Sequence, residues 1–359
     1  MTVTLHITVG LALGLGLLFV LSRLTRRREA LPFRVAILIG AGIGVLLIFW
    51  LISAILYPGS MFGRIQLLSW TVFVHIPFLL AGSAVCLRSH WRAGAWAMAG
   101  IAFALGLVAL DAFVIEPQWL EVNTLTLHST KLTEPVRVIV LADIQTDRPG
   151  RYEAGVLDQV MALQPDLILF TGDYIQLGRR SRDYVTELRA LQELLRDAGV
   201  AAPLGGYAVG GNVDQPAIWP QLFQGLPITA IQTTTRYDLG PAVLTGLSMQ
   251  DSFSVHLSLE PASKYHIVLG HSPNFALGPV EGDLLLAGHT HGGQVQLPFF
   301  GPLLTLTQAP RAWATGVTEI SPGRSLVVSR GIGLERGDAP RLRFLCRPEL
   351  VVIDLLPGE

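Results

Sequence analysis

Charged residues and cysteines are both scarce in this chain of 359 residues. Asp, Glu, Lys and Arg make up only 15% of the sequence, 50% is hydrophobic, and the mean hydropathy is +0.48. Average soluble domains carry about 25% charged residues, so this composition excludes a single ordinary soluble domain. The formal net charge of -1 provides no basic surface, and we therefore expect no nucleic-acid partner.

The two cysteines, Cys86 and Cys346, are not expected to form a disulfide. Cys86 falls in a long apolar run, whereas Cys346 belongs to the less apolar part of the chain. That second part has roughly 240 residues, which is long enough to build a core without disulfides.

The apolar excess lies before residue 116, in four runs that each approach the roughly 20 residues needed to cross a hydrocarbon core. The runs cover residues 4–22, 35–57, 66–87 and 93–115. The first run has no basic segment before it and is followed by "RLTRRR" instead of a small-residue cleavage site, so it is interpreted as a retained helix and not a signal peptide. We expect a transmembrane region of four helices over residues 1–116.

Arginines are distributed unevenly between these runs, which predicts the topology. Those between the first and second runs are Arg23, Arg26, Arg27, Arg28 and Arg34. Arg88 and Arg92 lie between the third and fourth runs, against Arg64 alone between the second and third. Because basic loops stay in the cytoplasm, we expect a multi-pass protein of the cytoplasmic (inner) membrane with everything after residue 116 on its extracytoplasmic face.

Beyond residue 116, short apolar segments alternate with amphipathic stretches, which is typical of an α/β domain. We predict strands at 136–142 and 166–172 and helices at 152–163 and 182–199. Further strands are predicted at "GYAVGG", "ITAIQ", "AVLTGLS", "YHIVLG", "DLLLAG", "RSLVVSRG" and "ELVVIDLL".

Five strands end on Asp, Asn or His, usually beside glycine, in "LADIQ", "FTGD", "GGNVD", "LGHS" and "AGHTHGG". One such ending would be an ordinary turn or helix cap. Five endings indicate a binding site, because ligands bind at the carboxyl edge of open α/β sheets. Oxygen and imidazole donors suit two divalent ions, which at about 3.5 to 4 Å apart can share a carboxylate and promote in-line attack on phosphorus. The candidate ligands are Asp143, Asp173, Asn212, His271, His289 and His291.

These motifs, in this order, resemble those of the calcineurin-like metallophosphoesterases, which carry D-x-H, G-D, G-N-H-D, a lone His and G-H-x-H. The resemblance runs from about residue 117 to the end and is closest to the membrane-anchored bacterial branch, through "EPQWLEV", "GHTHGGQVQLPFFGP" and "SRGIGLERGDAPRLRFLCRPEL". It implies a four-layer αββα sandwich over residues 117–359. It also implies two divalent metal ions, with Mn²⁺ expected and Mg²⁺, iron or Zn²⁺ as alternatives.

The resemblance assigns a role to each matching position. Asp143 and His291 would bind the first metal, and Asp173 would bridge the two. Asn212, His271 and His289 would complete the second metal, and Asp173 and Asn212 would be the catalytic residues. No substrate-binding residue is implied.

Gln145 departs from the family pattern, which has histidine there. An amide carbonyl is also a competent ligand, so we expect Gln145 to bind metal and to favour hard ions such as Mn²⁺ or Mg²⁺ over Zn²⁺.

Val213 departs more seriously, because the family's histidine at this position would stabilise the transition state or protonate the leaving group. Such a contribution is typically about 10²- to 10⁴-fold. Asp214, which would orient that histidine, is expected to be left without it and to cap the turn instead. Asp147, Arg148 and Arg330 are candidates for replacing the acid, against a plainer interpretation as turn or ion-paired surface residues.

The leading hypothesis is a membrane-anchored two-metal phosphoesterase that hydrolyses phosphodiester or pyrophosphate bonds, with lipid head groups or nucleotide-linked molecules as candidate substrates. The alternative is a metal-binding or sensory domain that has lost turnover. A transporter is disfavoured, because the spans lack the charged interior residues that a pathway would need. His75 and Asp111, in or near the spans, are interpreted as interfacial or helix-facing polar residues.

Two further features stay outside the predicted site. His128, His256 and His266 are interpreted as strand residues. The segment "LPFFGPLL" (297–304) would either contact acyl chains or the bilayer, or pack into the core.

Overall fold

The computed structural model describes residues 1–26, 32–178 and 182–358. The chain divides into two compact units, Met1–Val114 with Asp338–Pro340, and Ile115–Gly337 with Arg341–Glu359. The domain limits expected from the sequence, 1–116 and 117–359, stay a prediction about which parts fold independently.

The first unit consists of long helices. Two of them, α3 and α5, continue through single π-helical turns, η1 and η2. The elements are α1 (Val3–Arg26), α2 (Pro32–Ile55), α3 (Met61–Trp70), η1 (Thr71–His75), α4 (Ile76–Leu87), α5 (Arg92–Leu110) and η2 (Asp111–Ile115).

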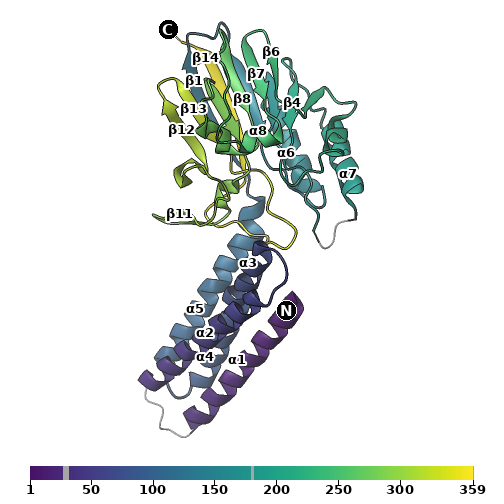
Figure 1. Cartoon of the computed structure of the whole chain (residues 1–359). Coiled ribbons are helices and arrows are strands. Elements are labelled where there is room, and N and C mark those ends of the chain that lie inside the picture. The colour runs from purple at the N-terminus through teal and green to yellow at the C-terminus, as the bar shows by residue number, and fades with distance from the viewer. Residues whose placement is uncertain (27–31, 179–181, 359) are drawn as a thin grey trace. The chain divides into compact units, whose positions relative to one another are not determined.

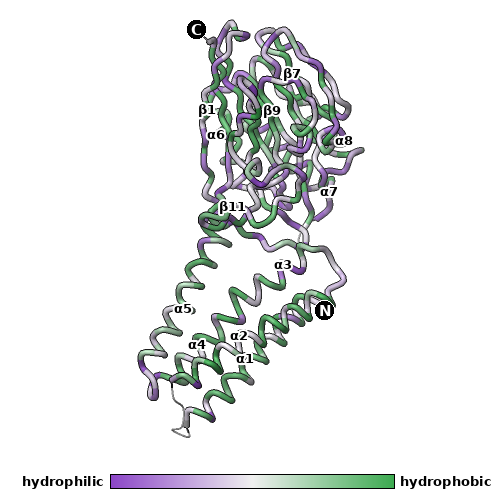
Figure 2. Tube along the Cα trace, turned by 60° about the vertical axis from the view of Figure 1, so that its left-hand side comes forward, coloured by the Kyte–Doolittle hydropathy of each residue, from purple (hydrophilic) through white to green (hydrophobic). Residues whose placement is uncertain are grey.

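Four helical stretches in the described residues are long and apolar enough to cross a membrane, as predicted. Figure 2 shows hydrophobic residues along most of their length. Large apolar side chains such as Phe33, Trp96 and Phe103 remain exposed, which is the arrangement expected of helices that face lipid. Arg27 and Arg28, on which the predicted topology partly rests, lie outside the described residues.

His75 lies inside this helical unit and is fully buried. Its ring centroid is 5.1 Å from that of His6, and His6 Nε2 lies 3.1 Å from both the Leu67 carbonyl and Thr71 Oγ1. A Cβ at Gly10 would come within 2.2 Å of the His75 ring, so glycine is required there to admit it. His75 therefore faces neighbouring helices and not the exterior.

The second unit contains two six-stranded sheets. The first has the order β1 (Glu121–Ser129), β14 (Glu349–Pro357), β2 (Val136–Leu141), β3 (Leu167–Phe170), β4 (Gly206–Val209) and β5 (Ile228–Ile231). The second has the order β12 (Gly316–Ser321), β13 (Arg324–Val328), β9 (Leu284–Ala287), β8 (Tyr265–Leu269), β7 (Ala242–Gly246) and β6 (Thr235–Asp238).

Strand direction brings the carboxyl ends of four strands to one edge of the first sheet. β2, β3, β4 and β5 are parallel, so their carboxyl ends meet at that edge. β14 is antiparallel to β2 and parallel to β1, which reverses β1 relative to β2. Val351 pairs with both Asn123 and Val140. The beginning of β1 therefore lies level with the end of β2.

Alternation of side chains along the strands builds the layers. Val138 and Val140 belong to the core between the two sheets, whereas Ile139 and Leu141 pack toward α6 (Arg151–Ala162) and α7 (Tyr184–Asp197). Figure 1 shows these two helices together on one side of the sheets. The outer face of the second sheet packs against residues around the short helices α8 (Met249–Phe253) and η5 (Pro273–Leu277). The predicted four-layer arrangement is confirmed, with a thin second helical layer.

Three histidines were expected to be strand residues outside the site, and two of them are. His128 is exposed on β1, and His266 in β8 bonds Thr245 Oγ1 at 2.7 Å and the Glu281 carbonyl at 2.9 Å. The strand interpretation of His256 was wrong, because this residue lies in a turn after α8. Its own amide donates to Ser254 Oγ, a local bond that replaces pairing with a strand.

Candidate metal centre

All seven predicted ligands follow the carboxyl ends of strands. Asp143 and Gln145 come after β2, Asp173 after β3 and Asn212 after β4. In the second sheet, His271 follows β8, and His289 and His291 follow β9.

The backbone at these positions is strained. Positive φ angles occur at five of the seven predicted ligands, a region that non-glycine residues seldom occupy. The angles are 46° at Asp143, 33° at Gln145, 56° at Asp173, 69° at His289 and 49° at His291. Strain of this kind costs of order 1–3 kcal/mol per residue and is concentrated where a function requires it.

Two glycines allow the loops after β3 and β4 to touch. A Cβ at Gly172 would lie 2.5 Å from the Gly211 nitrogen, and a Cβ at Gly211 would lie 2.1 Å from Asp173 Oδ1. Any larger residue at either position would push Asp173 away from its neighbours.

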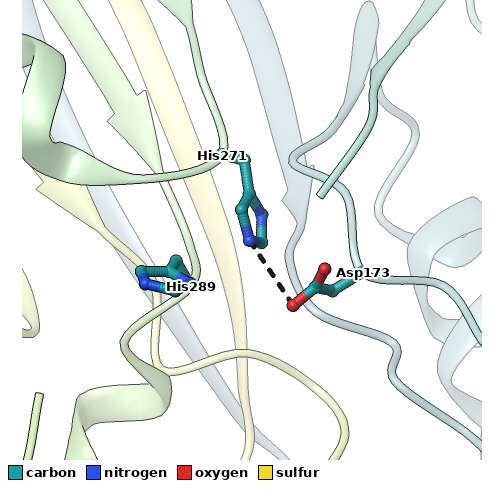
Figure 3. Close-up of side chains that lie close together, drawn as sticks. All are labelled: Asp173, His271 and His289. Carbon is teal, nitrogen blue, oxygen red and sulfur yellow. Dashed lines mark ion pairs between the residues drawn. The ribbon is translucent and has the colours of Figure 1, made fainter. Parts of the chain in front are cut away.

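Acidic and imidazole groups gather into two overlapping clusters. Asp173, His271 and His289 form one, and Asp143, Asp173 and His291 form the other, with ligand atoms of each within 4.8 Å of one another. Figure 3 shows the first cluster, in which His271 Nε2 lies 3.4 Å from Asp173 Oδ2. Asp173 belongs to both clusters, which is where a bridging ligand would have to lie.

Hydrogen bonding around His271 favours a positive charge on or beside its ring. The Thr171 carbonyl can only accept, so the 2.8 Å contact fixes the proton on Nδ1. Nε2 then faces two further acceptors, Asn212 Oδ1 at 2.9 Å and Asp173 Oδ2. Either a second proton or a cation must satisfy this arrangement.

The pKa values of the metal-free chain also favour a positive charge on His271. Burial disfavours a charged His271, but Asp173 and Asp143 outweigh it and raise its pKa to about 9. Burial raises the pKa of Asp143 to about 7, although His271 opposes the rise. Burial and the charge of His271 lower the pKa of His289 to about 4. Burial also holds the pKa of His291 well below its usual value.

Unsatisfied atoms in the described part of the chain show that the residues fit a metal. Both ring nitrogens of His291 and Oε1 of Gln145 are buried without hydrogen-bonding partners. The Gln145 amide nitrogen donates to Gln176 Oε1 at 2.9 Å and Glu335 Oε2 at 3.0 Å, which leaves its oxygen free to act as a ligand. Since buried polar groups normally find partners, these orphaned donor atoms fit a divalent ion.

The residues that hold Gln145 were missed from the sequence. Glu335 accepts from Gln145 and, at 2.6 Å, from Gln176 Nε2, and Arg336 Nε donates to the Gln145 carbonyl at 2.9 Å. Burial raises the pKa of Glu335. Gln176 stands three residues after Asp173, which is a weak signal, but no sequence pattern places Glu335 beside residue 145.

Asp214 caps its own turn, as expected, and also reaches the loop after β3. It is buried, Oδ2 accepts from the backbone amides of Asp173 and Gly211 at 2.8 Å each, and Oδ1 accepts from Tyr174 at 2.9 Å. Asp214 therefore joins the loops after β3 and β4. The Val213 amide donates to Asp173 Oδ1 at 3.0 Å, so the backbone of residue 213 orients the shared carboxylate although its side chain cannot transfer a proton.

Of the proposed replacements for the missing acid, two are occupied in ion pairs. Asp147 pairs with Arg341 and lies 3.7 Å from Arg336. Arg330 pairs with Glu121 at 2.7 Å and Glu349 at 3.3 Å. Arg148 is exposed. The plainer interpretation of Arg330 as an ion-paired residue agrees with these contacts, whereas Asp147 was expected to be a turn residue and is ion-paired instead.

We expect the affinity for Mn²⁺ to rise from about pH 6 to about pH 9, since a metal competes with protons for its ligands. His271, with a pKa of about 9, and Asp143, with a pKa of about 7, must lose their protons first. Metal binding near neutral pH should therefore release protons, which calorimetry in buffers of different ionisation enthalpy measures. His271→Gln should remove the alkaline part of this dependence, and an affinity independent of pH would contradict the assignment.

Comparisons with known proteins agree with this geometry. A family model described as calcineurin-like phosphoesterase matches residues 136–293. The metallophosphoesterase YkuE of Bacillus subtilis is 32% identical over 210 residues, which cover 54% of this chain and 68% of that protein. The phosphodiesterase YaeI of Escherichia coli is 26% identical, over 67% of this chain and 90% of that protein. The UDP-2,3-diacylglucosamine pyrophosphatase LpxG of Chlamydia muridarum is 23% identical, over 69% of this chain and 97% of that protein. With its two overlapping acid and imidazole clusters, this chain belongs to the calcineurin-like phosphoesterases, a family of metal-dependent hydrolases.

Proposed function

We propose that the chain is a membrane-anchored phosphoesterase that uses two divalent metal ions to hydrolyse phosphodiester or pyrophosphate bonds. The observation that carries this proposal is the position of Asp173 in both ligand clusters. One cluster would hold the first ion through Asp143, Gln145 and His291. The other would hold the second through Asn212, His271 and His289. Mn²⁺ is the ion we expect, with Mg²⁺, iron or Zn²⁺ as alternatives.

When bound, the ions would polarise the phosphoryl group and lower the pKa of water for in-line attack. The protein would fix the ligands through hydrogen bonds. The Thr171 carbonyl orients His271, and the Val213 amide orients Asp173. Glu335 accepts from the amide nitrogen of Gln145, which leaves the oxygen of that amide available for a metal. Two aspartates contribute a charge of -2 against +4 from two ions. The loaded site would therefore attract an anionic substrate.

The substrate class follows from what is missing at residue 213. Without an imidazole to protonate it, the leaving group must be a good one, which favours pyrophosphates or activated diesters. The similarity to LpxG, a pyrophosphatase named for a lipid-linked nucleotide, supports phosphorylated lipids or nucleotide-linked molecules as candidates. No nucleic-acid partner is proposed.

We place the protein in the cytoplasmic membrane with the phosphoesterase unit on the extracytoplasmic face. Four apolar helices and the distribution of arginines support this placement. A reporter enzyme active only outside the cytoplasm, fused after residue 359, should be active. Activity of a cytoplasm-specific reporter at the same position would reverse the topology.

The function is tested on the full chain in lipid nanodiscs. After chelator treatment, we expect no hydrolysis of a phosphodiester or a pyrophosphate, and recovery with Mn²⁺ to two ions per chain. Hydrolysis that persists in the metal-free protein would contradict the proposal. Bound metal without hydrolysis of any phosphoester would favour the alternative of a metal-binding or sensory domain.

Val213→His separates an under-equipped enzyme from a domain without turnover. An added imidazole should raise hydrolysis of a diester with a poor leaving group by about tenfold or more, and that of a pyrophosphate less. The gain should stay below the full 10²- to 10⁴-fold range because Asp214 is engaged with three amides and cannot orient the ring. Val213→Leu is the matched control. Equal rates for both variants would show that residue 213 does not limit the reaction.

A further inference from the structure

An apolar hairpin, here residues 296–306, follows the turn that carries His289 and His291. β10 (Gln296–Leu297) pairs with β11 (Gly301–Pro302) in antiparallel fashion. Figure 1 shows the hairpin that carries β11 projecting from the sandwich. Its large apolar side chains are exposed: Leu297 by 40%, Phe299 by 111%, Phe300 by 59%, Leu303 by 51% and Leu306 by 48%.

The hairpin does not serve the core of the sandwich. Core packing of "LPFFGPLL" was one of two expectations, and these exposed fractions contradict it. Phe299 also has a φ of 65°, a conformation that costs energy for a bulky residue and that glycine would adopt without strain. Burying a Phe or Leu side chain is worth about 1.5–3 kcal/mol each, so a contiguous exposed group of them indicates a binding surface.

Cationic side chains accompany these aromatics. The Arg311 guanidinium lies 4.3 Å from the centroid of the Phe300 ring, and Arg347 lies 4.1 Å from that of Trp119, which is 56% exposed. Aromatic rings beside cations are typical of surfaces at lipid head groups, where the ring enters the interface and the cation meets phosphate.

Hydrogen bonds within the phosphoesterase unit fix the hairpin to the edge where the chain arrives from its fourth span. The Gln296 amide donates to the Phe344 carbonyl at 2.9 Å. The next two amides, of Leu345 and Cys346, donate to the Glu116 carboxylate. Glu116 itself belongs to the apolar stretch Arg92–Gln118, and two residues separate that stretch from β1. The surface that the hairpin would contact is therefore the bilayer around this span.

The same edge carries the metal-binding loops. The beginning of β1 lies level with the end of β2, the strand that Asp143 follows, with β14 between the two strands. The base of the hairpin also touches a ligand directly, because His289 Nε2 donates to the Leu306 carbonyl at 3.2 Å. This bond leaves His289 Nδ1 available for a metal.

We propose that the apolar hairpin inserts into the interface of the bilayer that anchors the chain, so that the metal site takes phosphorylated lipids from that membrane. The part about substrate rests on the proposed function. The insertion of the hairpin does not.

Insertion is tested with a fluorescent label on Phe299→Cys in the full chain in nanodiscs. Thr133→Cys is the matched control, because Thr133 is exposed just beyond Ser129, at the opposite end of β1. The unsubstituted chain gives the background from Cys86 and from the buried Cys346. We expect brominated acyl chains to quench the label at 299 and not at 133, and iodide in water to do the reverse. Equal quenching by iodide at both positions would overturn the proposal.

The substrate half needs a second variant, Phe299→Ser with Phe300→Ser. Both side chains are exposed, so the fold should be kept. We expect a several-fold loss of hydrolysis of a pyrophosphate lipid in nanodiscs and an unchanged rate on a water-soluble phosphodiester. Equal rates of the variant and the unsubstituted chain on the lipid would overturn this half. If the unsubstituted chain hydrolyses neither substrate, the proposed function fails, and quenching still decides whether the hairpin inserts.

Discussion

Asp173→Asn is expected to abolish metal-dependent hydrolysis and to remove at least one of two metal ions. The substitution keeps the size of the side chain but removes the charge that both clusters share. An amide nitrogen facing His271 Nε2 at about the present 3.4 Å would also donate to the imidazole and compete with a metal for its lone pair. Metal-based stabilisation of transition-state charge is worth several kcal/mol, so we expect a loss in kcat/KM of about 10³-fold or more.

The measurement combines metal content by mass spectrometry with initial rates on a diester and a pyrophosphate. Asp197→Asn, at the exposed end of α7, is the matched control and should change neither quantity. Circular dichroism should show that both variants keep their fold, because asparagine has nearly the same size as aspartate and its oxygen can still accept from the Val213 amide. A variant that retains two ions and at least a tenth of the rate would exclude a bridging role for Asp173.

The sequence was sufficient to find the candidate ligands that the fold brings together, because these residues lie where strands end. Asp143, Asp173 and His271 directly follow buried strands, and strand order brings such ends to one edge. The four long apolar helices were equally predictable, since their apolar runs approach the length that crosses a hydrocarbon core. Local patterns of this kind need no knowledge of distant contacts.

The supports of the site could not be predicted in this way. Glu335 orients Gln145 across 190 residues of chain, a contact that only the folded loops create. Asp214 was expected only to cap its own turn, but its carboxylate also accepts from the amides of Asp173 and Tyr174 in the loop after β3. The strand β1 was expected only at His128, and its bounds were not predicted, because its "EVNTLTLHS" segment is half exposed at the edge of a sheet and lacks a continuous apolar run.

Burial of the hairpin was likewise undetermined from sequence. "LPFFGPLL" has the composition of a core segment, and the same residues would serve either a core or a lipid surface. The two-residue strands β10 and β11 pair only with each other in a hairpin. The apolar side chains of this hairpin are therefore left exposed.

Arg343→Met is expected to lower the free energy of unfolding of the phosphoesterase unit by about 3–5 kcal/mol, as the loss of a buried ionic group does. Arg343 is fully buried and donates to four carbonyls, with distances of 2.9 Å to Cys346, 2.7 Å to Arg330, 3.0 Å to Gly331 and 2.7 Å to Gly333. Methionine would fill the space but leave these carbonyls without donors, at about 1–3 kcal/mol each before relaxation.

The effect should extend to the metal site, because the segment that Arg343 holds lies against Asp143. The Gly333 amide donates to the Asp143 carbonyl at 2.8 Å, and a Cβ at Gly331 would lie 2.9 Å from Asp143 Cβ.

Thermal unfolding of the full chain in detergent should show a Tm lower by about 10 °C, since each kcal/mol moves Tm by about 2–4 °C in a unit of this size. Arg189→Met, on the exposed face of α7, should change stability by less than about 0.5 kcal/mol. Arg343→Lys should fall between the two, because an ammonium keeps the charge but cannot reach four carbonyls with a planar fork. Equal Tm values for Arg343→Met and Arg189→Met would mean that this buried guanidinium does not hold the loop beneath Asp143.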